Sequence, residues 1–431
     1  MGTKTQKLSN VVDQIVEWQS VFTGDGSTGL TAVAGRGYFI DPTSGTVTVT
    51  LPASPKAGDV VQLKDYARTW GTNNVTTASA LFDGIAGQTP SFSTDGQTVT
   101  LVYMDGTKGW SLINEDTTTG LGALYISATG GTVTESGDYK IHTFTGDGCF
   151  VVSCGGNAAG SNTVDYLVVA GGGGGGGDAG GGGGAGGFRL SNTTCMPAPL
   201  TSPLASSCGL PVSATTYRVT VGGGGAGHSA PAVPPAQKGQ KGSDSVFSTI
   251  TSAGGGGGGQ SSPVTGQADS GGSGGGGRGS APVGGSGNTP PVSPPQGQPG
   301  GNGPAGGAGG GGAACSGTPA GPSSPTPGGA GGSGSYVLGT GFAGPEGTSG
   351  PVCGARYFAG GGGGGGDQCG VAGGTGGTGG GGDSVGRPAP GPGTSGTANT
   401  GGGGGGGGVP SATSNGGAGG KGIVIIRYKF Q

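Results

Sequence analysis

Charged residues, histidines and long apolar runs are scarce in this 431-residue chain, and each scarcity excludes a class of protein. Only 9% of the residues are charged, and the net charge is −3. Because the basic residues form no stripe and no aromatics lie between them, nothing indicates nucleic-acid binding. No stretch comes near the roughly 18 consecutive apolar residues that a membrane-spanning helix needs. Membrane insertion is therefore not expected.

Histidine and cysteine are too few for the common metal sites. The chain has two histidines and seven cysteines, with no Cys-x-x-Cys pair, so no zinc site is expected, nor any other metal or cofactor. The Gly-x-Ser-x-Gly match at Gly271–Gly275 lacks the preceding strand and following helix that a serine hydrolase needs. No catalytic residue is assigned, and the chain is predicted not to be an enzyme.

Two cysteines are candidates for a disulfide. Cys195 and Cys208 flank a twelve-residue insert that contains three prolines. A bridge between them would remove about 3 kcal/mol of unfolded-state entropy by the loop-length model. Free thiols are the alternative for these two and for the other cysteines, so the pairing stays open.

Glycine is the residue that the chain has in excess. Its 119 glycines and 29 prolines make up about a third of the residues, a composition that usually indicates disorder. After residue 170, however, the glycines gather in uninterrupted runs such as Gly171–Gly177, Gly360–Gly366 and Gly401–Gly408, and an apolar segment, Ile423–Tyr428, follows the last of them. A flexible linker needs neither feature, which favours an ordered structure.

Ordered glycine runs have few available conformations. Glycine is unfavourable inside α-helices and strands, but it can adopt the left-handed form with three residues per turn, which has no internal hydrogen bonds. Buried backbone groups must still be paired, and neighbouring runs can pair with one another. The prediction for residues 171–431 is a bundle of polyglycine-II helices with flanking β-strands and variable connecting loops.

The residues before 171 predict mostly β modules after a short N-terminal α-helix. Over residues 1–20 one helical face is apolar, carried by Leu8, Val11, Val12, Ile15 and Val16. This helix either packs on its own domain or serves attachment and oligomerisation. Period-two alternation predicts a small antiparallel β-rich module over 21–118 and a second β module or connector over 119–170. Trp18, Trp70 and Trp110 are interpreted as core or interface fillers.

Several segments resemble the virion fibres of tailed phages, especially cyanophages. The glycine-rich half resembles the glycine-rich domain of tail-fibre adhesins at Tyr166–Gly177, Tyr217–Gly225, Gly396–Gly408 and Gly416–Tyr428, with Gly137–Phe150 similar to the strands before it. The N-terminal part resembles a β module of virion fibres at Trp18–Thr28, Gly71–Thr76 and Tyr103–Trp110.

The resemblance implies a virion tail-fibre protein, extracellular when mature, that binds a host-surface glycan or outer-membrane protein through its loops. It also implies a homotrimer that contacts other tail or baseplate proteins. The alternative is a purely structural fibre on tail, collar or capsid. On a rigid scaffold the loops are where recognition residues can vary, so the candidate receptor-binding residues are the scarce apolar and basic side chains of the loops: Phe188, Arg189, Met196, Leu200, Leu204 and Arg387.

Overall fold

The computed structural model describes residues 16–113, 123–157, 160–191, 204–206, 209–228, 238–260, 267–279, 282–338, 340–368, 370–385, 391–408 and 414–431. The chain divides into two compact units: unit 1 comprises residues 1–124 and 156–161, and unit 2 comprises 125–155 and 162–431. Most of the helix predicted over residues 1–20 lies outside the described residues. Its last part is not helical, because Glu17 and Trp18 form strand β1.

Unit 1 is built from short strands. They are β1 (Glu17–Trp18), β2 (Phe22–Thr23), β3 (Leu30–Thr31), β4 (Arg36–Asp41), β5 (Val47–Thr50), β6 (Val60–Asp65), β7 (Val75–Thr77), β8 (Ala80–Phe82), β9 (Ile85–Gln88), β10 (Ser91–Phe92), β11 (Thr98–Asp105) and β12 (Gly109–Leu112). Alternate residues of the longer strands are buried, as in β6 and β5, so one face of each sheet turns towards a shared apolar core.

The sheets of unit 1 are mixed rather than antiparallel as expected. An eight-stranded sheet has the order β1-β4-β6-β11-β12-β8-β9 with β2 on β4, and a four-stranded sheet has the order β10-β7-β5-β3. β4 pairs parallel with β6, and β5 pairs parallel with β7. The reason is the route of the chain, which passes from one sheet to the other and back, so that neighbours in a sheet point the same way.

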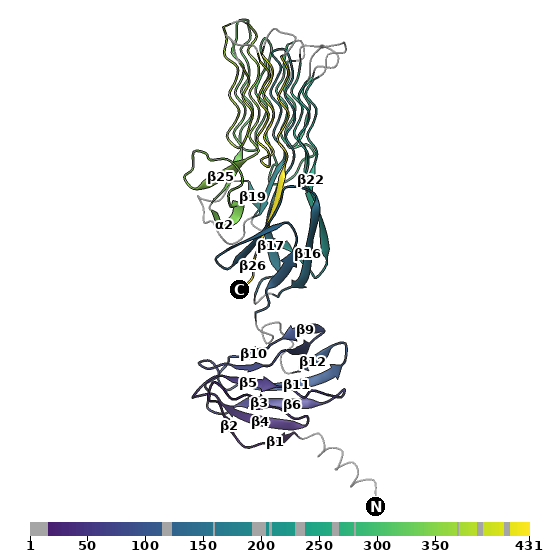
Figure 1. The fold of residues 1–431 in the computed structure, drawn as a ribbon, viewed down its shortest axis with the longest axis vertical. Helices are drawn as coiled ribbons and strands as arrows, with labels where there is room; N and C mark the ends of the chain where they lie inside the picture. Colours follow the sequence, from purple (N-terminus) through teal and green to yellow (C-terminus); the bar gives the residue numbers. More distant parts are fainter. Residues whose placement is uncertain are drawn as a thin grey trace, which may run out of the picture. The chain divides into compact units, whose positions relative to one another are not determined.

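Unit 2 begins with strands and returns to them between glycine runs (Figure 1). Its elements are β13 (Ile126–Thr129), β14 (Thr132–Ser136), β15 (Tyr139–Phe144), β16 (Gly148–Gly155), β17 (Thr163–Val169), β18 (Phe188–Ser191), β19 (Ala205–Ser206), β20 (Leu210–Pro211), β21 (Thr216–Thr220), β22 (Ser245–Phe247), β23 (Ile250–Ser252), β24 (Ser335–Leu338), α2 (Thr340–Ala343), β25 (Ala355–Phe358) and β26 (Ile423–Lys429).

The last strand of unit 2 occupies the middle of its largest sheet. That seven-stranded sheet has the order β14-β15-β26-β17-β18-β19, with β20 on β17. β26 pairs antiparallel with both β15 and β17, and its residues Ile423–Tyr428 are buried. A second sheet, β13-β16-β21-β22-β23, packs through an apolar cluster that includes Phe150 and Phe247. Residues near both ends of unit 2 therefore form one core.

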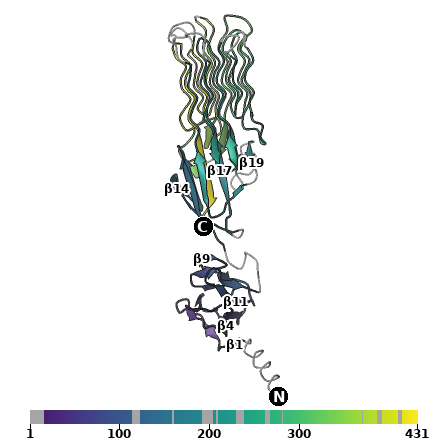
Figure 2. The same cartoon turned by 90° about the vertical axis from the view of Figure 1, so that its right-hand side faces the viewer.

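The predicted bundle of polyglycine-II helices is wrong as a description of the fold class. Strands account for 31% of the structure and helix for 1%, and no described helix reaches seven residues. The hydrogen bonds between neighbouring runs, which the prediction included, are present. The runs are nevertheless not helical elements, because their backbone groups bond to other runs rather than along the run, and the regular secondary structure consists of the sheets. We call the segments between residues 170 and 422 that bond to one another in this way the glycine array. Its segments lie side by side in both ribbon views (Figures 1 and 2).

Candidate functional site

The first glycine run lies at the centre of the glycine array. Gly173, Gly174 and Gly175 donate hydrogen bonds to Gly184, Gln240 and Gly417, and their carbonyls accept from Gly404, Gly258 and His228. Three consecutive residues thus bond to six different segments: 181–187, 239–243, 416–420, 401–408, 254–260 and 222–228. The pattern then repeats, since Gly176 donates to Gly181 as Gly173 does to Gly184. The run is enclosed on all sides by backbone.

This enclosure leaves no room for a side chain. A Cβ atom at Gly173 would lie 2.2 Å from the carbonyl oxygen of Gly256, and one at Gly175 would lie 2.1 Å from that of Gly405. In segments on the outside of the array, one position in three can carry a side chain. In the segment 372–378, Gly374 and Gly377 are buried while Thr375 between them is exposed. Inner positions such as Gly173 and Gly175 therefore admit no side chain, whereas outward positions such as Thr375 do.

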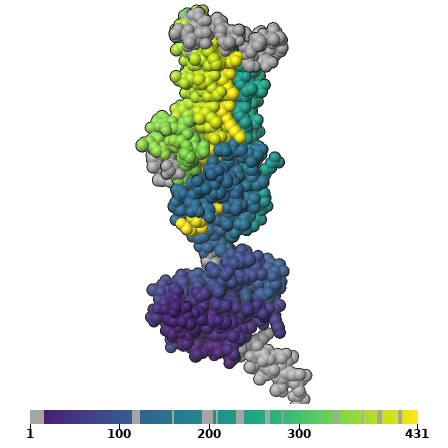
Figure 3. Space-filling view, viewed as in Figure 1, coloured from purple at the N-terminus to yellow at the C-terminus, as the bar shows by residue number. Residues whose placement is uncertain are grey.

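The glycine array has two different ends. At one end, the strand end, β17 leads into Gly171 and β18 follows Gly187. At the opposite end, the far end, the chain turns back at Asp178 and Ala179, both with positive φ. Segments that are distant in sequence meet along the whole length: 222–228 (teal) and 416–420 (yellow) lie side by side on the face seen in Figure 3.

Arg278 joins three turns at the far end. Its Nη1 donates to the carbonyl of Ala305, and its Nε donates to the carbonyl of Asp178 at 3.4 Å. Burial lowers the pKa of Arg278, while the nearby carboxylates of Asp178 and Asp367 act in the opposite direction. Asp367 in turn accepts a 2.7 Å hydrogen bond from the backbone of Thr326. These polar contacts fix the far-end turns to one another.

Two buried polar side chains at the far end have unused hydrogen-bonding capacity. His228 and Gln260 are 5% and 4% exposed, and neither Nδ1 of His228 nor Oε1 of Gln260 has a hydrogen-bond partner among the residues that the structure describes. Burial lowers the pKa of His228, with the Asp178 carboxylate opposing that effect. The imidazole is therefore neutral at physiological pH. The far end thus holds two buried polar side chains, His228 and Gln260, close to the polar residues Asp178 and Arg278.

Of the predicted receptor-binding residues, the structure describes Phe188, Arg189 and Leu204. Phe188 and Arg189 are not in a loop but in β18 at the strand end, where Phe188 is 1% exposed. Leu204 packs partly buried against the same apolar cluster as Phe188. Met196, Leu200, Arg387, Cys195 and Cys208 lie outside the described residues. The described neighbours of Arg387 belong to the far end, since a Cβ at Gly408 would lie 2.6 Å from the Val385 carbonyl oxygen.

Sequence reasoning missed Asp178, His228, Arg278 and Asp367. A signal for them was present, because Asp178, Arg278 and Asp367 each follow directly on a glycine run and His228 follows one within three residues. Their convergence at one end depends on the direction of each segment, which the glycine runs themselves do not encode. Among the described residues, no three His, Cys, Asp or Glu side chains group as metal ligands would. None of the helices in the described ranges is long and apolar enough to cross a bilayer.

A known domain family matches the residues that form the glycine array and its flanking strands. The family described as "Glycine-rich domain" matches residues 154–429, more than half of the chain. The chain belongs to this glycine-rich domain family. The match begins in β16 and ends in β26, so it covers the glycine array together with the strands β17 and β26 between which the array starts and finishes. No curated protein matches the chain.

Proposed function

We propose that the chain is a virion tail-fibre protein that binds a host-cell surface receptor at the far end of the glycine array. The observation that carries this proposal is the enclosure of residues 171–177 by six backbone segments. Such a scaffold has little room for side chains inside, but it holds its end turns rigidly, and Arg278 ties three of them together. Recognition residues on loops above a rigid scaffold can change without cost to the fold.

The proposed receptor surface at the far end includes only part of the set of residues predicted from the sequence. Of the predicted residues, Arg387 stays a candidate because its neighbours lie at the far end. Phe188 presents almost no surface to a receptor, and the segment that carries Met196 and Leu200 follows β18 at the strand end. The expected homotrimer, the attachment through residues 1–20 and the extracellular virion location belong to the same proposal.

Two matched replacements test the proposal. Residues 386–390, including Arg387, and residues 192–203, including Met196 and Leu200, are each replaced by a Gly/Ser turn in the full chain. Adsorption of the purified protein to host cells is then measured, with melting curves to check folding. We expect the first replacement to weaken adsorption about tenfold or more, the effect of losing about 1.4 kcal/mol, and the second to leave it unchanged.

The outcomes separate the two functions. Loss of adsorption only with the 192–203 replacement would place recognition at the strand end and contradict the proposal. Unchanged adsorption with both replacements, in proteins that still fold, would favour the purely structural fibre.

A further inference from the structure

Unit 1 carries an aromatic ring that the fold leaves open to solvent. Trp18 is 39% exposed, whereas Trp70 and Trp110 are 0% and 3% exposed. Of the three tryptophans interpreted as core or interface fillers, Trp70 and Trp110 belong to the core and Trp18 does not. Aromatic side chains supply much of the binding energy of proteins when they are rigid and accessible. The surroundings of Trp18 show that it is rigid.

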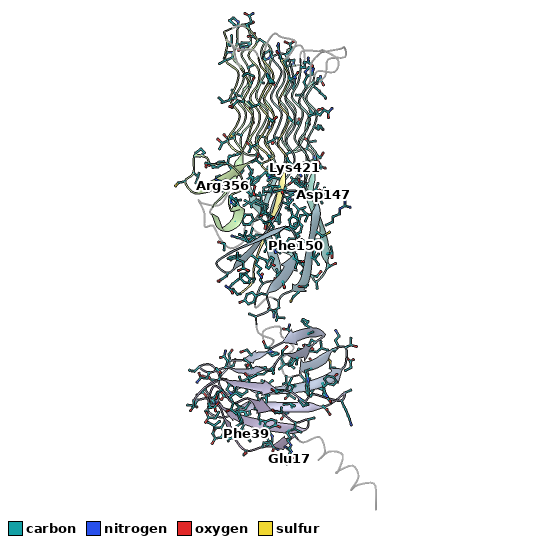
Figure 4. The ribbon with its side chains drawn as sticks, viewed as in Figure 1. Glu17, Phe39, Asp147, Phe150, Arg356 and Lys421 are labelled. Carbon is teal, nitrogen blue, oxygen red and sulfur yellow. The ribbon has the colours of Figure 1, made fainter. Side chains whose placement is uncertain are left out.

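Trp18 is held in place by backbone register and by a second ring. β1 pairs parallel with β4, which sets Trp18 opposite Gly37. Phe39, two residues further along β4 and on the same face, stacks on Trp18 with ring centroids 4.6 Å apart and an interplanar angle of 24°. A Cβ at Gly37 would lie 2.7 Å from the indole. The indole ring therefore occupies space that any residue other than glycine at position 37 would fill. Phe39 and Glu17, the neighbour of Trp18, lie on the same side of unit 1 (Figure 4).

The strands next to this aromatic pair present polar side chains on the same face. Gln62 stands opposite Gly37, and Lys64 stands opposite Phe39. Nε2 of Gln62 donates to Oγ1 of Thr100 at 3.2 Å, and Nζ of Lys64 donates to the Gly96 carbonyl at 2.6 Å. An amide and an ammonium have more donors and acceptors than these single bonds use. The face therefore combines a rigid aromatic pair with the hydrogen-bonding groups of Gln62 and Lys64.

We infer that this face of unit 1 binds a glycan through a pyranose ring stacked on the Trp18–Phe39 pair. A pyranose has an apolar face of C–H groups and a rim of hydroxyls, which match an aromatic surface beside an amide and an ammonium. A broad apolar protein face would instead bury Gln62 and Lys64 without partners for their remaining donors and acceptors, which is costly. The small apolar area and its polar surroundings thus favour a sugar over a second protein chain at this face, so the attachment proposed for residues 1–20 does not use Trp18.

The position of the tryptophans makes the inference directly measurable. Because Trp70 and Trp110 are buried, a change in tryptophan emission on adding sugar reports on Trp18. The full chain is applied to a printed panel of bacterial polysaccharides and is titrated with cellohexaose, maltohexaose and chitohexaose. We expect one or more of these probes to bind, and Trp18→Ala to weaken that binding at least tenfold without a change in melting temperature.

Two further variants control the experiment. Gly37→Ala keeps the tryptophan but displaces its ring, and we expect it to weaken binding as Trp18→Ala does. Ile85→Ala removes an apolar side chain of equal exposure, 39%, from another strand, and we expect it to have no effect. No binding of any probe by the wild type, or equal binding by Trp18→Ala, would overturn the inference. So would a change of oligomeric state in Trp18→Ala without any glycan binding, since the face would then be a contact between copies.

The failure of this inference leaves the proposed receptor surface untouched. The variants alter only unit 1, whereas the loop replacements of the adsorption experiment alter only unit 2.

Discussion

The guanidinium of Arg427 lies 2.7 Å from the carboxylate of Asp165, in a pair whose side chains are 5% and 4% exposed. The contact joins β26 to β17 across 262 residues of sequence. The same guanidinium lies over the rings of Tyr139 and Phe342, 4.6 Å and 4.7 Å from their centroids. One side chain near the end of the chain thus connects three earlier parts of unit 2.

Removing Arg427 should destabilise unit 2 strongly. Arg427→Met leaves the Asp165 carboxylate buried without its ion-pair partner, which costs about 3–5 kcal/mol. The double variant Arg427→Met/Asp165→Asn should recover part of that loss, because it removes the buried charge. Chemical denaturation followed by circular dichroism measures both. The exposed pair Lys140–Glu135 supplies the control, and Lys140→Ala should change stability by less than about 1 kcal/mol.

One segment of the glycine array offers a matched pair of glycine substitutions. A Cβ at Gly225 would lie 2.1 Å from the Gln240 carbonyl oxygen, whereas one at Gly223 meets nothing within 4 Å. Gly225→Ala should lose a hydrogen bond worth about 1 kcal/mol and overpack by about 1–3 kcal/mol. Gly223→Ala should be neutral or slightly stabilising, since it only restricts the unfolded chain. Equal melting temperatures for the two variants would contradict the close packing of the array.

The inner glycines of the array's later segments should be equally intolerant. A Cβ at Gly363 or at Gly404 would lie 2.0 Å from the carbonyl oxygen of Gly374 or Gly417. Calorimetry on Gly363→Ala and Gly404→Ala should show losses comparable to that of Gly225→Ala.

Deleting β26 should abolish the folding of unit 2 but not that of unit 1. The strand lies between β15 and β17 and supplies buried residues to two apolar clusters. A chain that stops at residue 420 should therefore lose the cooperative transition of unit 2 and become sensitive to protease there. Unit 1 has its own apolar core and should keep its transition. A protease-resistant unit 2 in the shortened chain would refute this prediction.

Acidification should weaken unit 2 through its histidines. Burial lowers the pKa of His142 below its ordinary value of 6.5, with the hydrogen bond to the Gly130 carbonyl opposing and Lys140 assisting. A lowered pKa means that folding favours the neutral ring, so the stability is fully present above about pH 6.5 and is lost as the pH falls below it. His142→Gln should flatten the fall between pH 7 and 5. Both histidines of the chain belong to unit 2, so unit 1 is an internal control.

The disulfide between Cys195 and Cys208 stays a prediction. Among the described cysteines, Cys149, Cys154, Cys315 and Cys353 are free. Peptide mass spectrometry without reduction should show Cys195 linked to Cys208, and alkylation of both thiols in the native protein would disprove the link.

Local patterns predicted the strands but not their partners. The alternation in residues 98–103 and the apolar run 423–428 correspond to β11 and β26. The parallel pairing of β4 with β6 was not predictable, because it depends on the chain crossing between two sheets. Of the polyglycine-II prediction, the hydrogen bonds between neighbouring runs are present, whereas the helical fold class is wrong, because the regular elements of the structure are strands.

The sequence predicted the type of residue in the candidate site but not which residues meet there. Scarce side chains among glycines do mark the turns of the array, as Arg278 shows, but the same criterion selected Phe188, which belongs to β18. The sequence contains no local sign of which end a segment reaches. That information lies in bonds such as Gly404 to Gly173, between residues more than half the chain apart.

The reversal of direction between runs that follow one another along the chain, seen between 171–177 and 181–187 and between 401–408 and 416–420, limits how such a protein can be enlarged by insertion. A single added run would leave the chain at the wrong end of the array, away from the strand that must follow. Insertions that preserve folding therefore come as hairpins of two runs, and they fit on the outside, where a run needs neighbours on its inner side only. Related proteins should therefore differ in the number of runs in the array rather than in the length of each run. Each added hairpin would bring one new loop to the far end.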